Sequence, residues 1–326
     1  MACLLHQNES QLSHGITVLL QSAYQRIFIP VFMLFIVVFG VTLNGAGVVD
    51  FFKSRLPKTP LNINIVHLFS LNVVLGLTQQ VMNTIGFFHP NRGGWVLGNR
   101  VCDLYMFCNT IFNALIVNTH GVLALNRTWA IMHPFSYRRL NTKTLSLQVI
   151  AGLWIYVLLV TLPLWLMDVI AYRKPVETSG CILNSAAQPV YNTVVVLLIS
   201  TLPVVVVWVA FVAVIVYKIR RRTILRIRPV HSGGSGTGNG DPAGSTIGVR
   251  RRLAKERQSW NFLIMTLLTV AVTVCYGPRT ILNALRSFTS ISWSSDVQMT
   301  TGVLISCQVV VDPVLLMLTL KRLHRI

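Results

Sequence analysis

The chain contains seven apolar segments, each long enough to cross a membrane as a helix. A helix of about 20 residues spans the ~30 Å hydrocarbon core of a bilayer. The segments cover roughly residues 27–52, 61–88, 99–132, 146–170, 188–219, 256–287 and 297–320. Only 11% of the residues are charged, whereas an average soluble domain carries about 25%, so a water-facing surface could not be covered. The sequence therefore predicts an all-α membrane protein built as a bundle of seven transmembrane helices.

Basic residues are concentrated in alternate connections between these segments. The chain has 28 Lys and Arg against 9 Asp and Glu, which gives a net charge of +19. If the N-terminus lies outside, 21 of the 28 basic residues fall on the inner side. The inner loops of membrane proteins carry such an excess. We therefore predict an outside N-terminus and an inside C-terminus, and the charge is explained by the lipid bilayer without a nucleic-acid partner.

This topology divides the chain into three parts. Residues 1–26 form an extracellular segment, 27–320 the transmembrane domain, and 321–326 a cytoplasmic tail stub. Residues 229–249 are rich in Gly and Ser, a composition typical of a flexible loop. Asn8 begins an Asn-Glu-Ser glycosylation sequon on the predicted outer side. We expect a glycosylated multi-pass protein of the plasma membrane.

The third segment carries a polar stripe along an otherwise apolar helix. Asn109, Asn113, His120 and Arg127 are spaced by 4, 7 and 7 residues, which places them on one face of a helix with about 3.6 residues per turn. In a membrane span, such a face is expected to contact other helices rather than lipid.

Further polar residues lie toward the predicted outer ends of the spans. They are Gln79, Asn83, Thr110, Arg279 and Asn283. Together with Asn109 and Asn113 they predict a polar cavity with a cationic wall, which suits a ligand that bears a carboxylate or phosphate, such as a peptide C-terminus or an acidic metabolite. The alternative for Arg279 is a side chain that extends from the helix end toward lipid headgroups.

Motifs of catalysis and metal binding are absent from the sequence. The six cysteines show no metal-ligand spacing, and no grouping of Ser, His and Asp or phosphate-binding loop occurs. His120 is interpreted as an interior histidine with satisfied hydrogen bonds. We therefore predict a protein that is not an enzyme and that needs no metal or cofactor.

Several sequence motifs occur in a characteristic order along the seven segments. They are Asn44 in the first span, Asn62 and Leu68 in the second, Trp95-Val96-Leu97-Gly98 before Cys102, Asn126-Arg127-Thr128 at the end of the third, Trp154 and Pro163 in the fourth, Pro203 in the fifth, Cys275-Tyr276-Gly277-Pro278 in the sixth and Asp312-Pro313 in the seventh. Arg127 follows Cys102 by 25 residues. Over nearly the whole chain, about residues 27–325, this pattern resembles the rhodopsin-like (class A) G-protein-coupled receptors.

The resemblance implies roles for particular residues. A disulfide would join Cys102 to Cys181, with two unrelated free cysteines as the alternative, and Tyr276 would lie at the floor of the ligand cavity. Coupling to a heterotrimeric G protein and activation would involve Arg127, Asn126, Thr128, Pro278, Asp312 and Pro313. Pro278 is expected to kink the sixth span, either as a hinge or as a static bend.

The sequence departs from the family pattern where activation is controlled. Asn126 replaces the acid that would hold Arg127 in the resting state, so we hypothesise a weak resting lock and raised basal activity. The family usually has an aspartate in the second span and an asparagine in the seventh, whereas this chain has Asn72 and Asp312. One buried carboxylate therefore remains in this region. Ile116 stands where the family's sodium pocket has a serine, which argues against a sodium site. An equal alternative to a functional role for Asn72 and Asp312 is a hydrogen-bonded network that only steadies the bundle.

Two positions argue against particular ligands. Asn109 stands where amine receptors carry an aspartate, and Ser306 where opsins carry the retinal lysine. We therefore expect a receptor that transmits the binding of a peptide or small acidic molecule to G proteins. The alternative is a seven-helix protein that binds ligands or forms heteromers without signalling.

Overall fold

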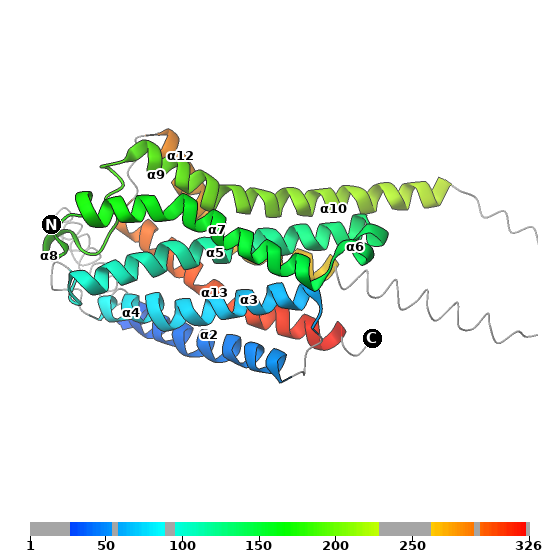
Figure 1. The fold of residues 1–326 in the computed structure, drawn as a ribbon, viewed down its shortest axis with the longest axis horizontal. Coiled ribbons are helices and arrows are strands. Elements are labelled where there is room, and N and C mark those ends of the chain that lie inside the picture. Colours follow the sequence, from blue (N-terminus) through cyan, green and yellow to red (C-terminus); the bar gives the residue numbers. More distant parts are fainter. Residues whose placement is uncertain (1–26, 54–57, 89–94, 228–261, 290–293, 324–326) are drawn as a thin grey trace, which may run out of the picture.

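The computed structural model describes residues 27–53, 58–88, 95–227, 262–289 and 294–323. Within these ranges all regular structure is helical, and the long helices run side by side (Figure 1). The predicted glycosylation site Asn8, the predicted extracellular segment 1–26 and the predicted flexible loop 229–249 lie outside the described residues.

Each of the seven predicted segments contains a helix. The helices are α2 (Ile29–Phe52), α3 (Pro60–Leu75) continued by η2 (Gly76–Gln80) and α4 (Val81–Phe87), α5 (Asn99–Met132), α7 (Lys143–Met167) continued by η3 (Asp168–Tyr172), α9 (Pro189–Val196) continued by η4 (Leu197–Thr201) and α10 (Leu202–Ile227), the pair Phe262–Cys275 and α12 (Gly277–Phe288), and α13 (Ser295–Leu323). Two short helices, α6 (Pro134–Leu140) and α8 (Val176–Ser179), lie in connections. Six described helices are long and apolar enough to cross a membrane, and the bent pair makes a seventh.

Two predicted boundaries differ from the structure. Helix α10 continues to Ile227, beyond the expected end at 219, and α13 continues to Leu323, into the expected tail. Both extensions are rich in Lys and Arg, which have good helix propensity, so the helical backbone outlasts the apolar stretch.

Helix α5 is the central element of the bundle. It contacts α3, α7, α10 and the turn η2, and its residues from Ala114 to Gly121 are all buried. Gly98, immediately before the helix, has φ +79°, a left-handed conformation that favours glycine. Of the predicted polar stripe on α5, His120 and Arg127 are buried, whereas Asn109 and Asn113 are half-buried.

Prolines inside the spans leave backbone carbonyls without their helical donor, and at two of them a buried side chain replaces that donor. Pro203 cannot bond the carbonyl of Ile199, which instead accepts from Asn118 Nδ2 at 3.0 Å. Pro313 frees the carbonyl of Val309, which accepts from Asn44 Nδ2 at 2.7 Å. These bonds fasten the fifth span to α5 and the seventh to α2.

The predicted kink of the sixth span is present. Segments Phe262–Cys275 and Gly277–Arg286 are bent by 48° at Tyr276. Pro278 lies just after the break and has no N–H to bond the preceding turn.

Close packing of α2 against α3 yields a first prediction. A Cβ added at Gly47 would lie 2.6 Å from two ring carbons of Phe69, whereas one at Gly45 would meet nothing within 4 Å. Because the Phe69 ring is fully buried, we expect Gly47→Ala to destabilise the purified protein by about 1–3 kcal/mol. Thermal unfolding in detergent measures this. Gly45→Ala in the same helix is the control and should be neutral or slightly stabilising; an equal loss in both variants would contradict the packing explanation.

Candidate ligand cavity and polar core

A cavity of about 430 Å³ opens among α4, α5, η4, α12 and α13, within the usual range for small-ligand sites. All eight residues predicted to bind a ligand line it. They are Gln79, Asn83, Asn109, Thr110, Asn113, Tyr276, Arg279 and Asn283. The structure thus brings together residues from three separate predicted spans, although their role in binding stays a prediction.

Irregular turns position part of this lining. The π-helical turn η2 carries Gln79 and Gln80, and η4 carries Ile199 and Ser200. Such turns shift the helical register locally and are frequent at functional sites. Gln80 exchanges hydrogen bonds with Ser306 on α13, at 3.0 and 3.2 Å.

The cavity wall is rich in amides and carries one guanidinium. Carboxamides from eight residues line it: Gln79, Gln80, Asn83, Asn109, Asn113, Asn192, Asn283 and Gln298. Arg279 Nη1 donates to the Gln298 carbonyl at 3.2 Å and to Thr301 Oγ1 at 3.4 Å. No Asp or Glu is among the described lining residues, so the wall is positively charged. Sequence reasoning missed Asn192 and Gln298, because spacing within one span does not reveal which faces of other spans converge.

Arg286 does not belong to this site. It shares a helical face with Arg279 in the sequence, but the structure leaves it exposed and outside the cavity lining.

A buried polar core lies beneath the cavity. His120 Nε2 is 2.9 Å from Asp312 Oδ1, and Asp312 Oδ2 accepts from Asn72 Nδ2 at 3.2 Å. Gln308 Nε2 also donates to Asp312 Oδ1, and Asn72 donates to Asn44 Oδ1 at 3.1 Å. All five side chains are at most 2% exposed. Asn72 is thus the partner of Asp312 that the sequence suggested, whereas Asn44 contacts Asn72.

The geometry limits which protonation states this core can adopt. His120 Nδ1 lies 2.8 Å from the carbonyl of Ile116, which can only accept, so Nδ1 carries a hydrogen. The short distance from Nε2 to Asp312 Oδ1 requires a second hydrogen between those atoms. The pair is therefore imidazolium with carboxylate, or imidazole with carboxylic acid, and has no net charge in either state. Sequence reasoning placed His120 in the interior but did not identify this partner.

At the far end of α5, Arg127 is buried, and the side chains of its neighbours Asn126 and Thr128 both form hydrogen bonds. Asn126 accepts from Tyr137 Oη of α6 at 3.1 Å and donates to Asn141 at 3.4 Å. Burial raises the pKa of the Tyr137 phenol, although the positive charge of nearby Arg127 acts in the opposite direction. Thr128 Oγ1 donates to the Ala124 carbonyl of its own helix at 2.9 Å.

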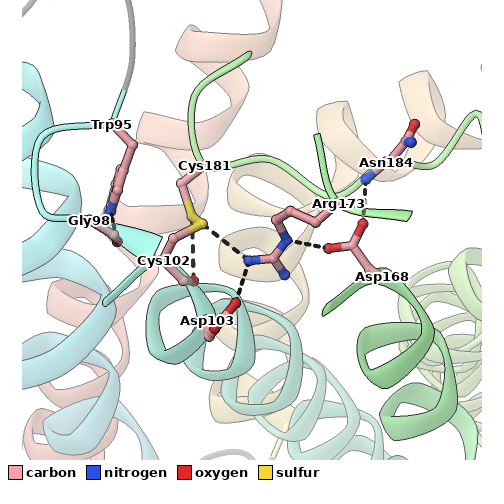
Figure 2. The surroundings of a disulfide bond; sticks show 8 residues. All are labelled: Trp95, Gly98, Cys102, Asp103, Asp168, Arg173, Cys181 and Asn184. Atoms are coloured by element: carbon pink, nitrogen blue, oxygen red, sulfur yellow. Dashed lines mark hydrogen bonds and ion pairs between the residues drawn. A yellow bond between two sulfur atoms is a disulfide. The ribbon is translucent and has the colours of Figure 1, made fainter. Parts of the chain in front are cut away.

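The opposite end of α5 is fixed by the predicted disulfide. Cys102 is bonded to Cys181, with their Cα atoms 5.6 Å apart, so the alternative of two free cysteines is wrong. Figure 2 shows the guanidinium of Arg173 beside this bond, between the carboxylates of Asp103 and Asp168. We call this the disulfide end of the bundle, and the other the Arg127 end.

Comparison with known proteins identifies the family. The sequence model described as 7 transmembrane receptor (rhodopsin family) matches residues 43–316. The chain belongs to the rhodopsin family of seven-transmembrane receptors. Members of this family are receptors rather than enzymes.

Individual relatives match only in part. Melanopsin from Felis catus is 28% identical over 124 residues, which is 38% of this chain and 25% of that protein. The 5-hydroxytryptamine receptor 1B from Canis lupus familiaris is 28% identical over 170 residues, 50% of this chain and 42% of that receptor. The matched region thus spans between a quarter and two-fifths of these relatives.

The receptor's polar core supplies a second prediction. His120→Leu would leave the Asp312 carboxyl with amide partners alone, and breaking a buried ion pair in this way costs about 3–5 kcal/mol. We expect a marked loss of thermal stability in detergent that a second substitution, Asp312→Asn, largely reverses. The single variant Asp312→Asn completes the cycle, and purely additive losses would show that the two groups do not act as a pair.

Proposed function

We propose that this chain is a plasma-membrane receptor that binds an extracellular ligand in the cavity and transmits binding to a heterotrimeric G protein. In this proposal the disulfide end faces outward, the Arg127 end faces the cytosol, the N-terminus is outside and the C-terminus inside. The excess of basic residues in the predicted inner loops supports this orientation.

The composition of the cavity wall supports the proposed class of ligand, which is a peptide or a small acidic molecule. Carboxamides both donate and accept, as peptide groups do, and Arg279 adds a charged donor suited to a carboxylate. The side-chain oxygens of Gln79 and Asn113 are buried without a hydrogen-bond partner in the described protein, so a ligand that donates hydrogen bonds would satisfy them.

The lining of the cavity does not suit the kinds of ligand that the relatives' names suggest. One relative is named for 5-hydroxytryptamine, an amine, but the described lining offers no carboxylate for an ammonium group. Ser306, where the family resemblance places the retinal lysine of opsins, is instead bonded to Gln80. We therefore favour neither an amine ligand nor a Schiff-base chromophore.

The proposed activation is an outward movement of the sixth span at the Arg127 end, about the bend at Tyr276. In the present structure that end is held by aromatic contacts: Phe211 stacks on Phe262 with ring centroids 6.3 Å apart, and Lys218 Nζ lies 3.5 Å from the Phe262 ring centre. Ligand binding would shift the population between two packings of the bundle.

We further propose raised basal activity. An amide at position 126 cannot form an ion pair with Arg127, and here that amide is engaged by Tyr137 and Asn141. The alternative function, a receptor-like protein that binds without coupling, is favoured by the same departures at Asn126 and Thr128.

Basal signalling distinguishes these functions. We expect G-protein activation without ligand in cells that express the wild-type chain, lost in Arg127→Ala and reduced in Arg127→Gln, because the guanidinium would contact the G protein. Second-messenger output at matched surface expression measures this. Arg100→Ala, an exposed cation at the disulfide end, is the control and should keep wild-type output. Output equal to that of empty cells would contradict raised basal activity and would leave two options, a receptor that is silent without its ligand and the non-coupling alternative.

The ligand proposal has its own test. Among acidic peptides and metabolites that bind the purified receptor, we expect Arg279→Gln to weaken affinity by about tenfold or more, because a charged hydrogen bond contributes roughly 1.5–3 kcal/mol. Arg286→Gln, on the same helix but outside the cavity, should leave affinity unchanged. Equal effects of the two substitutions would indicate general electrostatic attraction rather than a contact in the cavity.

A further inference from the structure

Part of the cavity is an apolar recess between the third, fourth and fifth spans. Five aliphatic residues line both the cavity and the main core there: Ala114 and Val117 on α5, Leu164 on α7, Val195 on α9 and Ile199 on η4. Each is buried, with at most 6% of its surface exposed. The polar residues that the fifth span adds to the cavity, Asn192 and Ser200, are less deeply buried. We call the part lined by the five aliphatic residues the recess, and its hydrocarbon walls favour an apolar group of a ligand.

Polar groups beside the recess are already engaged by the protein. Asn118 Nδ2 donates to the carbonyls of Ala114 and Ile199, at 2.8 and 3.0 Å. Thr161 also lines the cavity, and its hydroxyl donates to the carbonyl of Val157 at 2.7 Å. A peptide group placed in the recess would therefore lose its hydrogen bonds to water and gain few in return. The recess thus suits a hydrocarbon tail better than a continued peptide backbone.

Asn113 presents a fixed hydrogen-bond acceptor directly before the recess on α5. Its Nδ2 donates to the carbonyl of Asn109 at 2.8 Å and to Asn109 Oδ1 at 3.0 Å. These two bonds set the orientation of the amide, because an exchange of its oxygen and nitrogen would lose both. Asn113 Oδ1 is buried and has no hydrogen-bond partner among the described residues. A ligand with an N–H group at this point would satisfy it.

The sixth span adds the charged group of the cavity. Arg279 Nη1 donates to the carbonyl of Gln298 and to the hydroxyl of Thr301, both of which are neutral. Because the described lining holds no carboxylate, a ligand carboxylate would form a charged hydrogen bond with this guanidinium. The cavity therefore combines a cationic donor, a fixed acceptor and a hydrocarbon recess.

An acid group joined to a hydrocarbon chain through one amide matches all three features. We propose that the cavity binds an N-acyl amino acid, with its carboxylate at Arg279, its amide N–H at Asn113 Oδ1 and its acyl chain in the recess. This inference rests on the proposed function of the cavity as a ligand site. It selects one class among peptides and small acids, because a longer peptide would place polar backbone groups against hydrocarbon walls.

The test is direct binding to the purified wild-type receptor. N-octanoylglycine is titrated calorimetrically into the full-length chain in lipid nanodiscs, with empty nanodiscs as the reference. We expect N-octanoyl-N-methylglycine, which lacks the N–H, to bind about tenfold more weakly, because it leaves the buried acceptor unpaired. Shortening the acyl chain to hexanoyl and butanoyl should weaken binding about three- to fourfold for each methylene removed.

Matched variants locate each part of the ligand. Val195→Phe fills the recess and should abolish the dependence of affinity on acyl-chain length. Val194→Phe, one residue earlier on the same helix but 43% exposed and outside the cavity lining, should keep that dependence. Asn113→Ala should make the N–H and N-methyl compounds bind alike. The comparison of compounds on the wild-type chain stands by itself if a variant fails to fold.

Three results would overturn the proposal. One is an absence of N-octanoylglycine binding to the folded wild-type receptor, and another is equal affinity for the N–H and N-methyl compounds. The third is a chain-length dependence that Val195→Phe and Val194→Phe share, which would indicate partition into the bilayer.

The outcomes also separate this inference from the proposed function. Binding of the N-acylglycines without any signalling would contradict the proposed coupling alone, because calorimetry needs no G protein. An acidic peptide that binds where the N-acylglycines do not would overturn the inference and leave the proposed receptor function in place.

Discussion

The bundle depends on satisfying polar backbone groups where no water is available to bond them. In a membrane span each unpaired N–H or C=O is costly, and proline creates such a group by removing a donor. In this chain, asparagines from neighbouring helices supply the missing donors: Asn118 donates to the carbonyl of Ile199, and Asn44 donates to that of Val309. At Pro203 and Pro313, proline and asparagine therefore act as matched pairs that join neighbouring helices.

The polar core also contains a buried group that needs a hydrogen-bond partner, in this case a carboxyl group rather than a backbone carbonyl. Asp312 is fully buried, and a lone carboxylate there would be strongly unfavourable. The hydrogen between His120 Nε2 and Asp312 Oδ1 makes the pair neutral. The pair also lies between the two regions of proposed function, because the His120 ring lies 6.1 Å from that of Tyr276 at the bend of the sixth span, while Arg127 follows two turns farther along α5. Movement at the cavity floor would therefore act on the helix that carries the proposed coupling residue.

Local patterns in the sequence predicted those features that depend on one segment. Hydropathy gave the spans, Pro278 gave the bend, and polar residues on individual helical faces indicated the cavity lining. The partner of His120 could not be predicted in this way, since pairing with Asp312 depends on how α5 and α13 are rotated against each other. The role of Arg173 could not be predicted either, because its two carboxylate partners come from different spans and neither lies at a fixed spacing.

The two ends of the bundle are held by interactions of unequal strength. At the disulfide end, a covalent bond and a guanidinium between two carboxylates join the third span to the connection that follows the fourth. At the Arg127 end, the fifth and sixth spans meet through a ring stack and a cation over an aromatic ring, contacts that contribute about 0.5–2 kcal/mol each. If the bundle changes its packing as proposed, these weaker contacts would separate first. A structural change that begins at the cavity is therefore expected to be small at the disulfide end and larger at the Arg127 end.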